Sequence, residues 1–242
     1  MQPSPTSAHS PTMPTILLIG ASRGLGHAMA AEFVEQGWQV VGTVRAGSGR
    51  TRLHELADAH PGRVGIETLD ITRPDELAAL RARLAGRRFE ILFVNAGTTN
   101  PDPNQTIGEV STEDFTNLMI TNALSPMRVV ERLCDLVPAD GLIGVMSSGQ
   151  GSVADNESGQ REVYRGSKAA LNQLMRSFAA RQAGTPRAML LMAPGWVRTE
   201  LGGPGGRLSI EESVPGVVRV LLDKRGRPGL EYLDYRGRTV RW

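Results

Sequence analysis

Short apolar runs alternate with longer amphipathic segments along almost the whole chain. The first run, residues 15–20 (TILLIG), is almost free of polar positions and ends on glycine, as is typical of a strand buried on both faces. The later runs of this kind are residues 38–44, 63–70, 89–97, 141–148, 187–195 and 229–235. The segments that we expect to be helices are residues 25–37, 52–60, 72–86, 111–137, 160–182 and 210–223.

Strands that alternate with helices are joined by right-handed crossovers, which produce a parallel sheet covered on both faces. The pattern therefore predicts an α/β fold, a doubly wound (Rossmann) parallel sheet of about seven strands in a single domain over residues 14–242. Residues 1–13 are rich in Pro, Ser and Thr, and we expect them to be a disordered tail. Ligands of such folds bind at the carboxyl ends of the strands, so the loops that follow the strands are the candidate functional segments.

Three of the expected helices begin with a capping signal. Thr72 lies three residues before Asp75, and Ser209 lies three residues before Glu212, which is the spacing of a capping box. Ser111 is the expected N-cap of the long helix that follows it.

Composition excludes several classes of function. The 27 basic and 25 acidic residues leave a net charge of only +2, so the basic pI is no argument for nucleic-acid binding. No apolar run reaches membrane-spanning length, and the first residues lack the pattern of a signal peptide. The single cysteine, Cys134, can form no internal disulfide, which fits a cytoplasmic location. The four histidines lie outside the candidate loops, so no metal site is expected.

A glycine-rich turn, residues 20–26 (GASRGLG), joins the first strand to the first helix. Gly20 permits a tight turn, and Gly24 and Gly26 allow close approach of a pyrophosphate and of the neighbouring strand. The free N–H groups and the dipole of the following helix favour a phosphate there. The spacing differs from the commoner G-x-G-x-x-G pattern, and a purely structural turn is the alternative interpretation.

The residues after the second strand indicate which dinucleotide binds. An acidic residue there would bind the ribose 2′-hydroxyl of NAD, whereas an arginine suits the 2′-phosphate of NADP. The strand ends on Arg45, with no acid before Glu55, and Arg23 within the glycine turn is a second phosphate partner. The sequence therefore favours NADPH/NADP+ over NADH, although two solvated arginines are the alternative in a chain with 25 of them.

Tyr164 and Lys168 share a face of their expected helix, because they are four residues apart. Lys168 is one of only two lysines in the chain. A free tyrosine has a pKa near 10, and a nearby ammonium should lower the pKa of Tyr164 toward working pH. Such a pair can exchange a proton with a substrate. A compact ammonium also suits a sugar diol better than the wide guanidinium of arginine would.

Six short motifs make the chain similar to the short-chain dehydrogenase/reductase family over residues 15–242. The motifs are GASRGLG (20–26), NAG (95–97), ITNALSP with Asn122, SSGQG (147–151), YRGSK (164–168) and PGWVRT (194–199). The segments around Ser148, around Pro194 and at the C-terminus most resemble the branch of C-factor-like and sniffer-like carbonyl reductases. The resemblance implies reduction of a ketone or aldehyde, or oxidation of the alcohol, by hydride transfer. The alternative is a nucleotide-binding signalling or interaction protein of C-factor type with a secondary catalytic role or none.

The resemblance also assigns residue roles. It implies that Ser148, with Ser147 as the weaker candidate, holds the substrate carbonyl, that Tyr164 donates the proton, that Lys168 activates Tyr164, and that Asn122 anchors a water. The implied cofactor-binding residues are Gly20, Ser22, Arg23, Gly24, Leu25, Gly26, Arg45, Asp70, Ile71, Asn95, Ala96, Gly97, Tyr164, Lys168, Pro194, Gly195, Val197 and Thr199.

The chain departs from the family pattern at Ile19, where a threonine is usual, and at Val94, where an asparagine is usual. Both changes remove polar links between cofactor loops, which puts the rigidity of those loops in doubt. In the family, the segment after Pro194 and Gly195 covers the substrate. Here the glycines around Pro204 favour a short, mobile lid over an open pocket, and an ordered glycine turn is the alternative. The resemblance also implies a homodimer or homotetramer formed through helices near 112–136 and 160–182, with a monomer as the alternative in this branch. It further implies a small-molecule carbonyl or alcohol substrate.

Overall fold

The sheet in the centre of the molecule has seven strands, and every neighbouring pair is parallel. The structure is a computed structural model that describes residues 13–242, so the tail predicted at the N-terminus falls almost wholly outside the described residues. The strand order is β3-β2-β1-β4-β5-β6-β7, which confirms the predicted doubly wound fold class. The strands are β1 (Thr15–Ile19), β2 (Gln39–Val44), β3 (Val64–Thr68), β4 (Ile91–Val94), β5 (Leu142–Met146), β6 (Ala188–Ala193) and β7 (Gly229–Asp234).

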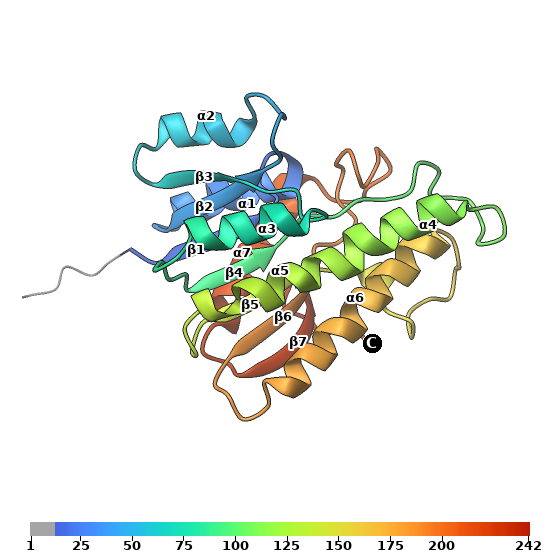
Figure 1. Cartoon of the computed structure of the whole chain (residues 1–242). Coiled ribbons are helices and arrows are strands. Elements are labelled where there is room, and N and C mark those ends of the chain that lie inside the picture. Colours follow the sequence, from blue (N-terminus) through green and yellow to red (C-terminus); the bar gives the residue numbers. More distant parts are fainter. Residues whose placement is uncertain (1–12) are drawn as a thin grey trace, which may run out of the picture.

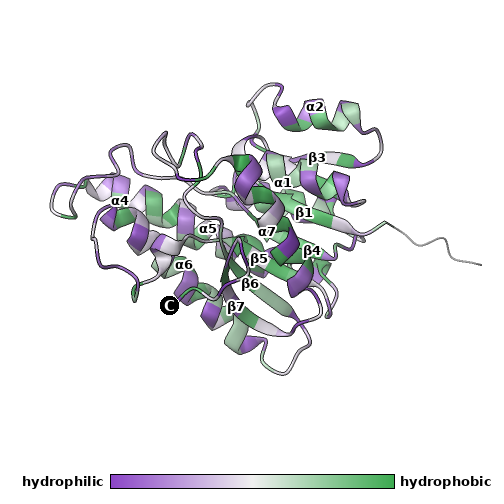
Figure 2. Ribbon diagram, turned by 180° about the vertical axis from the view of Figure 1, so that it is seen from behind, coloured by the Kyte–Doolittle hydropathy of each residue, from purple (hydrophilic) through white to green (hydrophobic). Residues whose placement is uncertain are grey.

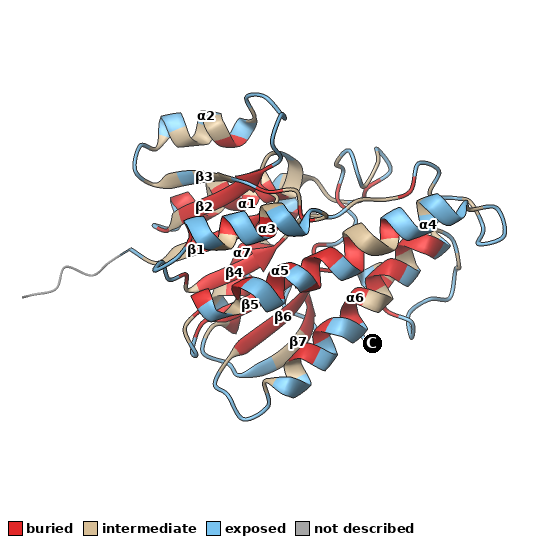
Figure 3. Ribbon diagram, in the orientation of Figure 1, coloured by how far each residue is buried: buried red, intermediate tan, exposed pale blue. Residues whose placement is uncertain are grey.

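Helices cover both faces of the sheet (Figure 1). They are α1 (Gly24–Glu35), α2 (Arg52–Ala59), α3 (Pro74–Arg83), α4 (Thr112–Met119), α5 (Ser125–Leu133), α6 (Glu162–Arg181) and α7 (Ile210–Lys224). Alternate residues of a strand point to opposite faces, so β1 sends Ile16 and Leu18 into the core beneath α1 and α7, and Leu17 into the core beneath α3, α5 and α6. Figure 2 shows the first of these faces and Figure 3 the buried strands between the two helical layers.

The segment expected to be one long helix, residues 111–137, has a more complex form. Ser111 caps α4 as predicted, because its hydroxyl accepts a hydrogen bond from the Asp114 amide at 3.0 Å. After α4 the helix widens into a π-helical turn, Ile120–Leu124, before α5 begins, and a short 3-10 turn follows Leu133. The predicted long helix is confirmed, because helical turns run without a break from Thr112 to Leu136, but its middle is a π-helical turn with Asn122 at the centre.

The two capping boxes have different outcomes. Ser209 and Glu212 form the predicted box at the start of α7. The box predicted from Thr72 and Asp75 is wrong, because α3 begins one residue later, at Pro74. The hydroxyl of Thr72 instead donates to the carboxylate of Asp70 at 2.7 Å, which closes the loop after β3.

The chain reverses its direction of travel across the sheet at β1, which pairs with β2 on one side and β4 on the other. The crossovers on the two sides run over opposite faces, so a crevice opens beyond the carboxyl ends of these central strands. The loops after Ile19 and Val94 border this crevice directly, and the ends of β2, β5 and β6 complete it. The fold therefore gathers the candidate loops along one edge of the sheet.

Candidate active site

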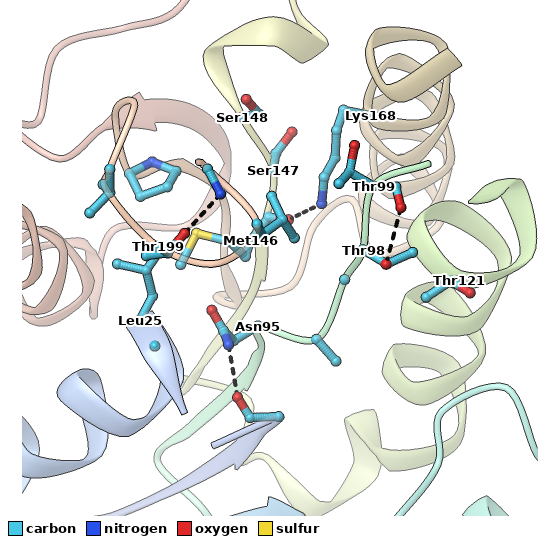
Figure 4. Close-up of a pocket in the computed structure, with 18 of the residues that line it drawn as sticks. Leu25, Asn95, Thr98, Thr99, Thr121, Met146, Ser147, Ser148, Lys168 and Thr199 are labelled. Carbon is cyan, nitrogen blue, oxygen red and sulfur yellow. Dashed lines mark hydrogen bonds between the residues drawn. The ribbon is translucent and has the colours of Figure 1, made fainter. Parts of the chain in front are cut away.

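A single cavity of about 1370 Å³ lies at this edge and is wide enough for a dinucleotide together with a small substrate. Its wall contains nearly all of the predicted site residues. Those that line it are Gly20, Ser22, Arg23, Gly24, Leu25, Arg45, Asp70, Ile71, Asn95, Ala96, Gly97, Ser148, Tyr164, Lys168, Pro194, Gly195, Val197 and Thr199. Gly26 and Asn122 lie behind the wall. In Figure 4, Ser148 and Lys168 lie together, away from Leu25 and Asn95.

The glycine turn is packed too closely for larger residues. Gly20 has a φ of +88°, and a Cβ there would come within 2.9 Å of Ala96. A Cβ on Gly26 would lie 2.0 Å from the carbonyl oxygen of Gly20. A Cβ on Gly24 would meet nothing within 4 Å, so the turn is open on that side. The residues present would therefore fit a pyrophosphate at the start of α1, and its binding there stays a prediction.

Two polar links hold the turn despite the departures from the family pattern. The amide of Gly20 donates to the Thr43 hydroxyl at 2.8 Å, and the Asn95 side chain donates to the Gly20 carbonyl at 2.8 Å. Ile19 and Val94 are instead buried in the core. Thr43, which no sequence motif marked, therefore supplies a polar link to the glycine turn, and the rigidity of the loops stays a prediction.

Arginines surround the end of the cavity that holds the glycine turn. Arg45 lies just after β2 and near Asp70. Burial works to raise the pKa of Asp70, but hydrogen bonds from Thr72 and, as smaller effects, the charges of Arg45 and Arg73 hold it below its usual value. Arg52, at the first position of α2, also lines the cavity and was not predicted. Arg23 pairs with Glu200 across the cavity mouth. Arg45 and Arg52 have no carboxylate partner in the described part of the chain, so this region of the cavity wall is positively charged.

Tyr164 and Lys168 face the same cavity from α6, as their spacing predicted. The Lys168 Nζ lies 5.8 Å from the centroid of the Tyr164 ring and donates to the Met146 carbonyl at 2.9 Å. Only 6% of Tyr164 and 4% of Lys168 is exposed. A Cβ on Gly97 would lie 3.3 Å from the Asn122 amide oxygen and 3.5 Å from the Lys168 Nζ, so the loop after β4 packs directly beside the ammonium.

The expected direction of the Tyr164 pKa is wrong for this structure. Burial raises the pKa of Tyr164 above its ordinary value, and the charge of Arg161 and a hydrogen bond with the Ser148 side chain oppose the rise. Burial also lowers the pKa of Lys168 to about 8. The spacing of the two residues predicted their proximity correctly, but desolvation of the phenol outweighs the opposing effects of Arg161 and Ser148 on its pKa.

Ser148 and Ser147 have different surroundings. Both serines border the cavity, but Ser147 is buried and its hydroxyl donates to the Asn172 side chain at 2.6 Å, whereas Ser148 is half-buried. Tyr232, on β7, donates its hydroxyl hydrogen to the Ser148 carbonyl. These contacts fix the loop after β5 with the Ser148 hydroxyl beside Tyr164, and they favour Ser148 over Ser147 as the residue that meets a substrate.

Asn122 is fully buried in the π-helical turn and contacts the loop after β4. Its amide oxygen accepts from the Thr98 amide at 2.8 Å, and its amide nitrogen donates to the Thr98 carbonyl at 2.9 Å and to the Ser167 hydroxyl at 3.0 Å. Asn122 thus joins the wall of the cavity to α6. The water expected beside it stays a prediction.

The segment between β6 and α7 forms hydrogen bonds of its own. The Gly203 amide donates to the Thr199 carbonyl at 2.8 Å, the Arg198 amide donates to the Leu208 carbonyl at 2.9 Å, and the Trp196 indole donates to the Gly202 carbonyl at 2.8 Å. These bonds are those of the ordered glycine turn, the alternative to a mobile lid. The mobility of the segment itself stays a prediction.

Four residues important to this geometry were missed from the sequence. Asn172 follows Lys168 by one helical turn, so helical spacing could have revealed it. No local pattern marks the other three, because Tyr232 and Thr43 lie on distant strands and Arg161 lies in a sharp turn.

Among residues 13–242 no helix has the length and apolarity to cross a membrane, and no group of three or more His, Cys, Asp and Glu could hold a metal ion.

Together, the doubly wound sheet, the glycine turn and the Ser148, Tyr164 and Lys168 cluster define a dinucleotide-binding oxidoreductase. The chain belongs to the short-chain dehydrogenase/reductase family, as the sequence motifs predicted. A family model described as enoyl-(acyl carrier protein) reductase matches residues 20–211.

Individual relatives agree with this assignment. A short-chain dehydrogenase/reductase from Burkholderia multivorans, solved with bound NADP, is 79% identical with a TM-score of 0.95, over 96% of this chain and 100% of that one. A carbonyl reductase from Pseudomonas aeruginosa PAO1 in complex with NADP is 36% identical with a TM-score of 0.87, over 96% and 100%. The C-signal protein of Myxococcus xanthus is 33% identical over 138 residues, which is 56% of this chain and 83% of that protein.

Proposed function

We propose that the protein is an NADPH-dependent carbonyl reductase that converts a ketone or aldehyde to an alcohol, or catalyses the reverse reaction. The observation that supports this best is the meeting of two groups of residues in one cavity. Ser148, Tyr164 and Lys168 lie around one part of it, and the glycine turn with Arg23 and Arg45 lies around another. The NADP bound to the Burkholderia and Pseudomonas relatives supports the choice of cofactor.

Each residue has a defined part in this proposal. When bound, NADPH supplies the hydride that the carbonyl carbon accepts. Ser148 donates a hydrogen bond to the carbonyl oxygen, where negative charge develops. Tyr164 holds its proton at neutral pH, because burial raises its pKa, and gives this proton to the same oxygen. Lys168 places a positive charge beside the resulting phenolate, so the carbonyl gains one hydride and one proton to become an alcohol.

The remaining site residues would hold the cofactor. The turn from Gly20 to Gly26 would bind the pyrophosphate, and Arg45 with Arg23 the 2′-phosphate. Asp70 and Ile71 would contact the adenine, and residues 95–97 its ribose. Pro194, Gly195, Val197 and Thr199 would position the nicotinamide end.

Tyr164→Phe tests the proposal because it removes one oxygen atom and leaves the ring. We expect kcat on a panel of ketones and aldehydes to fall by about 10³-fold, since the proton donor is lost, whereas the Kd for NADPH should change by less than about threefold. Tyr235→Phe is the matched control, because Tyr235 also borders the cavity but lies outside the predicted catalytic group. It should keep turnover within about fivefold.

Appreciable turnover by the Tyr164→Phe variant would show that the proton comes from elsewhere.

A second candidate function, nucleotide-dependent signalling or interaction without required catalysis, is favoured by the similarity to the C-signal protein. Tight NADPH binding by the unmodified protein with no reduction of any carbonyl in the panel would favour this second function.

A further inference from the structure

Arg161 places a guanidinium group directly beside the proposed proton donor. It lies three residues before Tyr164, borders the cavity, and has its Cζ 4.7 Å from the centroid of the Tyr164 ring. Its Nη2 donates to the Thr99 hydroxyl at 3.2 Å, which ties the start of α6 to the loop after β4. The Arg161 guanidinium therefore lies in the part of the cavity around Tyr164, where the proposed reaction takes place, whereas the glycine turn lies in another part.

The guanidinium of Arg161 has no carboxylate partner among residues 13–242. Its Nε is buried and has no hydrogen-bond acceptor, which is unfavourable for a charged donor. The neighbouring Glu162 turns away and accepts from the Ile107 amide at 2.7 Å. A positive group with donors to spare is thus held next to the reaction centre.

The acidic residues that border the same cavity already have partners. Glu200 pairs with Arg23, Asp234 pairs with Arg238, and Asp70 accepts from Thr72. No acid from the described chain is therefore placed to neutralise Arg161, and a ligand is the remaining source of a counter-charge.

The backbone also holds Arg161 in an unusual conformation. Gln160 and Arg161 have φ values of +53° and +52°, a left-handed region that residues other than glycine rarely adopt. Arg165, one helical turn further along α6, stabilises the backbone conformation of Gln160 and Arg161, because its Nε donates to the Gln160 carbonyl at 2.9 Å. Residues other than glycine that are held in this region cluster at active sites and ligand-binding sites.

We infer that Arg161 is a specificity-determining residue that binds an anionic group of the substrate, and that the preferred substrate is an oxo acid with its carboxylate a few bonds from the reacting carbonyl. This inference rests on the proposed carbonyl reductase function. The flat fork of N–H groups matches a carboxylate, which can accept two parallel hydrogen bonds. Ser148 and Tyr164 would fix the carbonyl oxygen while Arg161 fixes the carboxylate. The oxo acid then takes one hydride from NADPH and one proton from Tyr164 to give the hydroxy acid.

A different role for Arg161 would be to tune Tyr164 alone, since its charge acts on that phenol. The two roles predict different substrate dependence. Tuning would change the rate for charged and neutral carbonyls by the same factor, whereas anion binding would change the rate only for the charged ones.

The test compares 2-oxo, 3-oxo and 4-oxo acids with their methyl esters, with NADPH as cofactor. We expect the unmodified protein to have a kcat/KM at least about tenfold higher for one of the acids than for its ester. Arg161→Gln should lower kcat/KM for that acid by about 100-fold and change the ester by less than about threefold. Arg161→Lys should recover part of the loss, because it keeps the charge without the planar fork.

Arg165→Gln is the matched control. It removes the same charge one turn along α6 and weakens the same turn, but Arg165 lies outside the cavity. The ratio of acid to ester rates should stay within about twofold of the unmodified protein. Calorimetric binding of the hydroxy acid to the complex with NADP+ gives a second readout that needs no turnover, and Arg161→Gln should weaken this binding by about 100-fold.

Equal losses for acid and ester, or unchanged hydroxy-acid binding in the Arg161→Gln variant, would overturn the inference and leave the reductase function intact. If the unmodified protein reduces no carbonyl at all, the proposed function fails. The binding measurement still decides the anion site in that case, because weaker hydroxy-acid binding by Arg161→Gln would support it and unchanged or absent binding would overturn it.

Discussion

At the scale of one residue, the buried charge of Lys168 lowers the stability of the folded chain and yet is present in the candidate active site. Its ammonium is buried and has one hydrogen-bond acceptor in the protein, the Met146 carbonyl. Burial favours the neutral form, so the pKa of Lys168 falls to about 8. A charge in this position disfavours folding at neutral pH. Its presence is therefore better explained by the proposed chemistry than by packing.

Lys168→Met should separate stability from activity. In the folded state the pKa is about 8, below the ordinary value of 10.5, so the unfolded chain binds more protons between these pH values. The free energy of unfolding of the unmodified protein should therefore rise with pH above about 8. At pH 7 the variant should be more stable by about 1–3 kcal/mol and inactive, since each pKa unit corresponds to about 1.4 kcal/mol. Urea unfolding between about pH 7 and 9.5 measures both effects below the tyrosine titrations.

The other lysine provides the control. Lys224 lies 2.8 Å from the Glu231 carboxylate and donates to the Arg227 carbonyl at 2.6 Å. Burial lowers the pKa of Lys224 as well, but the Glu231 carboxylate opposes this shift, a partner that Lys168 lacks. Lys224→Met should lower the free energy of unfolding at pH 7, because it leaves the Glu231 carboxylate and the Arg227 carbonyl without their donor. A Lys168→Met variant that is less stable than the unmodified protein at pH 7 would contradict the explanation.

At the scale of elements, the widened turn between α4 and α5 determines the shape of the cavity wall. A regular helix would place residue 122 at a different angle to the loop after β4. The π-helical turn instead lets Asn122 pair with both backbone groups of Thr98 and with Ser167 on α6. Three elements distant in sequence are thus joined through one buried amide.

Asn122→Ala should weaken this junction. It leaves the backbone groups of Thr98 buried without their partners, so we expect the free energy of unfolding to fall by about 2–3 kcal/mol in a urea titration. Asn117→Ala, an exposed change on the adjoining helix, should lower it by less than about 0.5 kcal/mol. Equal effects of the two substitutions would show that the Asn122 hydrogen bonds contribute little to stability.

At the scale of the whole molecule, the strand order brings the ends of β2 and β5 to the same edge of the sheet. Arg45 and Ser148 are therefore in one cavity although β1 and β4 lie between their strands. Under the proposed function, the cofactor preference would depend on Arg45, which lies on a different strand end from the proposed reaction centre.

Arg45→Asp should change this preference. Loss of the guanidinium and the added negative charge should raise the Kd for NADPH by about 100-fold, whereas the Kd for NADH should change by less than about threefold. Fluorescence titration with each cofactor measures both constants. Arg87→Asp makes the same change in net charge at an exposed position outside the cavity and should alter neither value. Equal losses for both cofactors would place Arg45 away from the 2′-phosphate.

The homodimer or homotetramer and the cytoplasmic location implied by the family resemblance stay predictions. Phe115, Leu124 and Leu174 are about two-fifths exposed, at 41%, 39% and 41%, on the helices expected to meet another copy. Exposed apolar side chains on these helices are compatible with such an interface.

The sequence by itself determined the features that depend on neighbours along the chain. Apolar runs such as residues 15–20 predicted buried strands, because a strand covered on both faces has no polar side. The glycines of residues 20–26 predicted a tight turn, because only glycine allows such close backbone contacts. The spacing of Tyr164 and Lys168 predicted their shared face, because helical geometry alone places residues i and i+4 together.

Only the tertiary structure decided the features that depend on burial and on distant partners. Tyr232 reaches Ser148 across 84 positions of the chain, and Arg161 reaches Thr99 across 62, so no local pattern could reveal either contact. The direction of the Tyr164 pKa was predicted wrongly for the same reason. A spacing of four residues shows that a positive charge is near, but the loss of water around the phenol depends on every element packed against it.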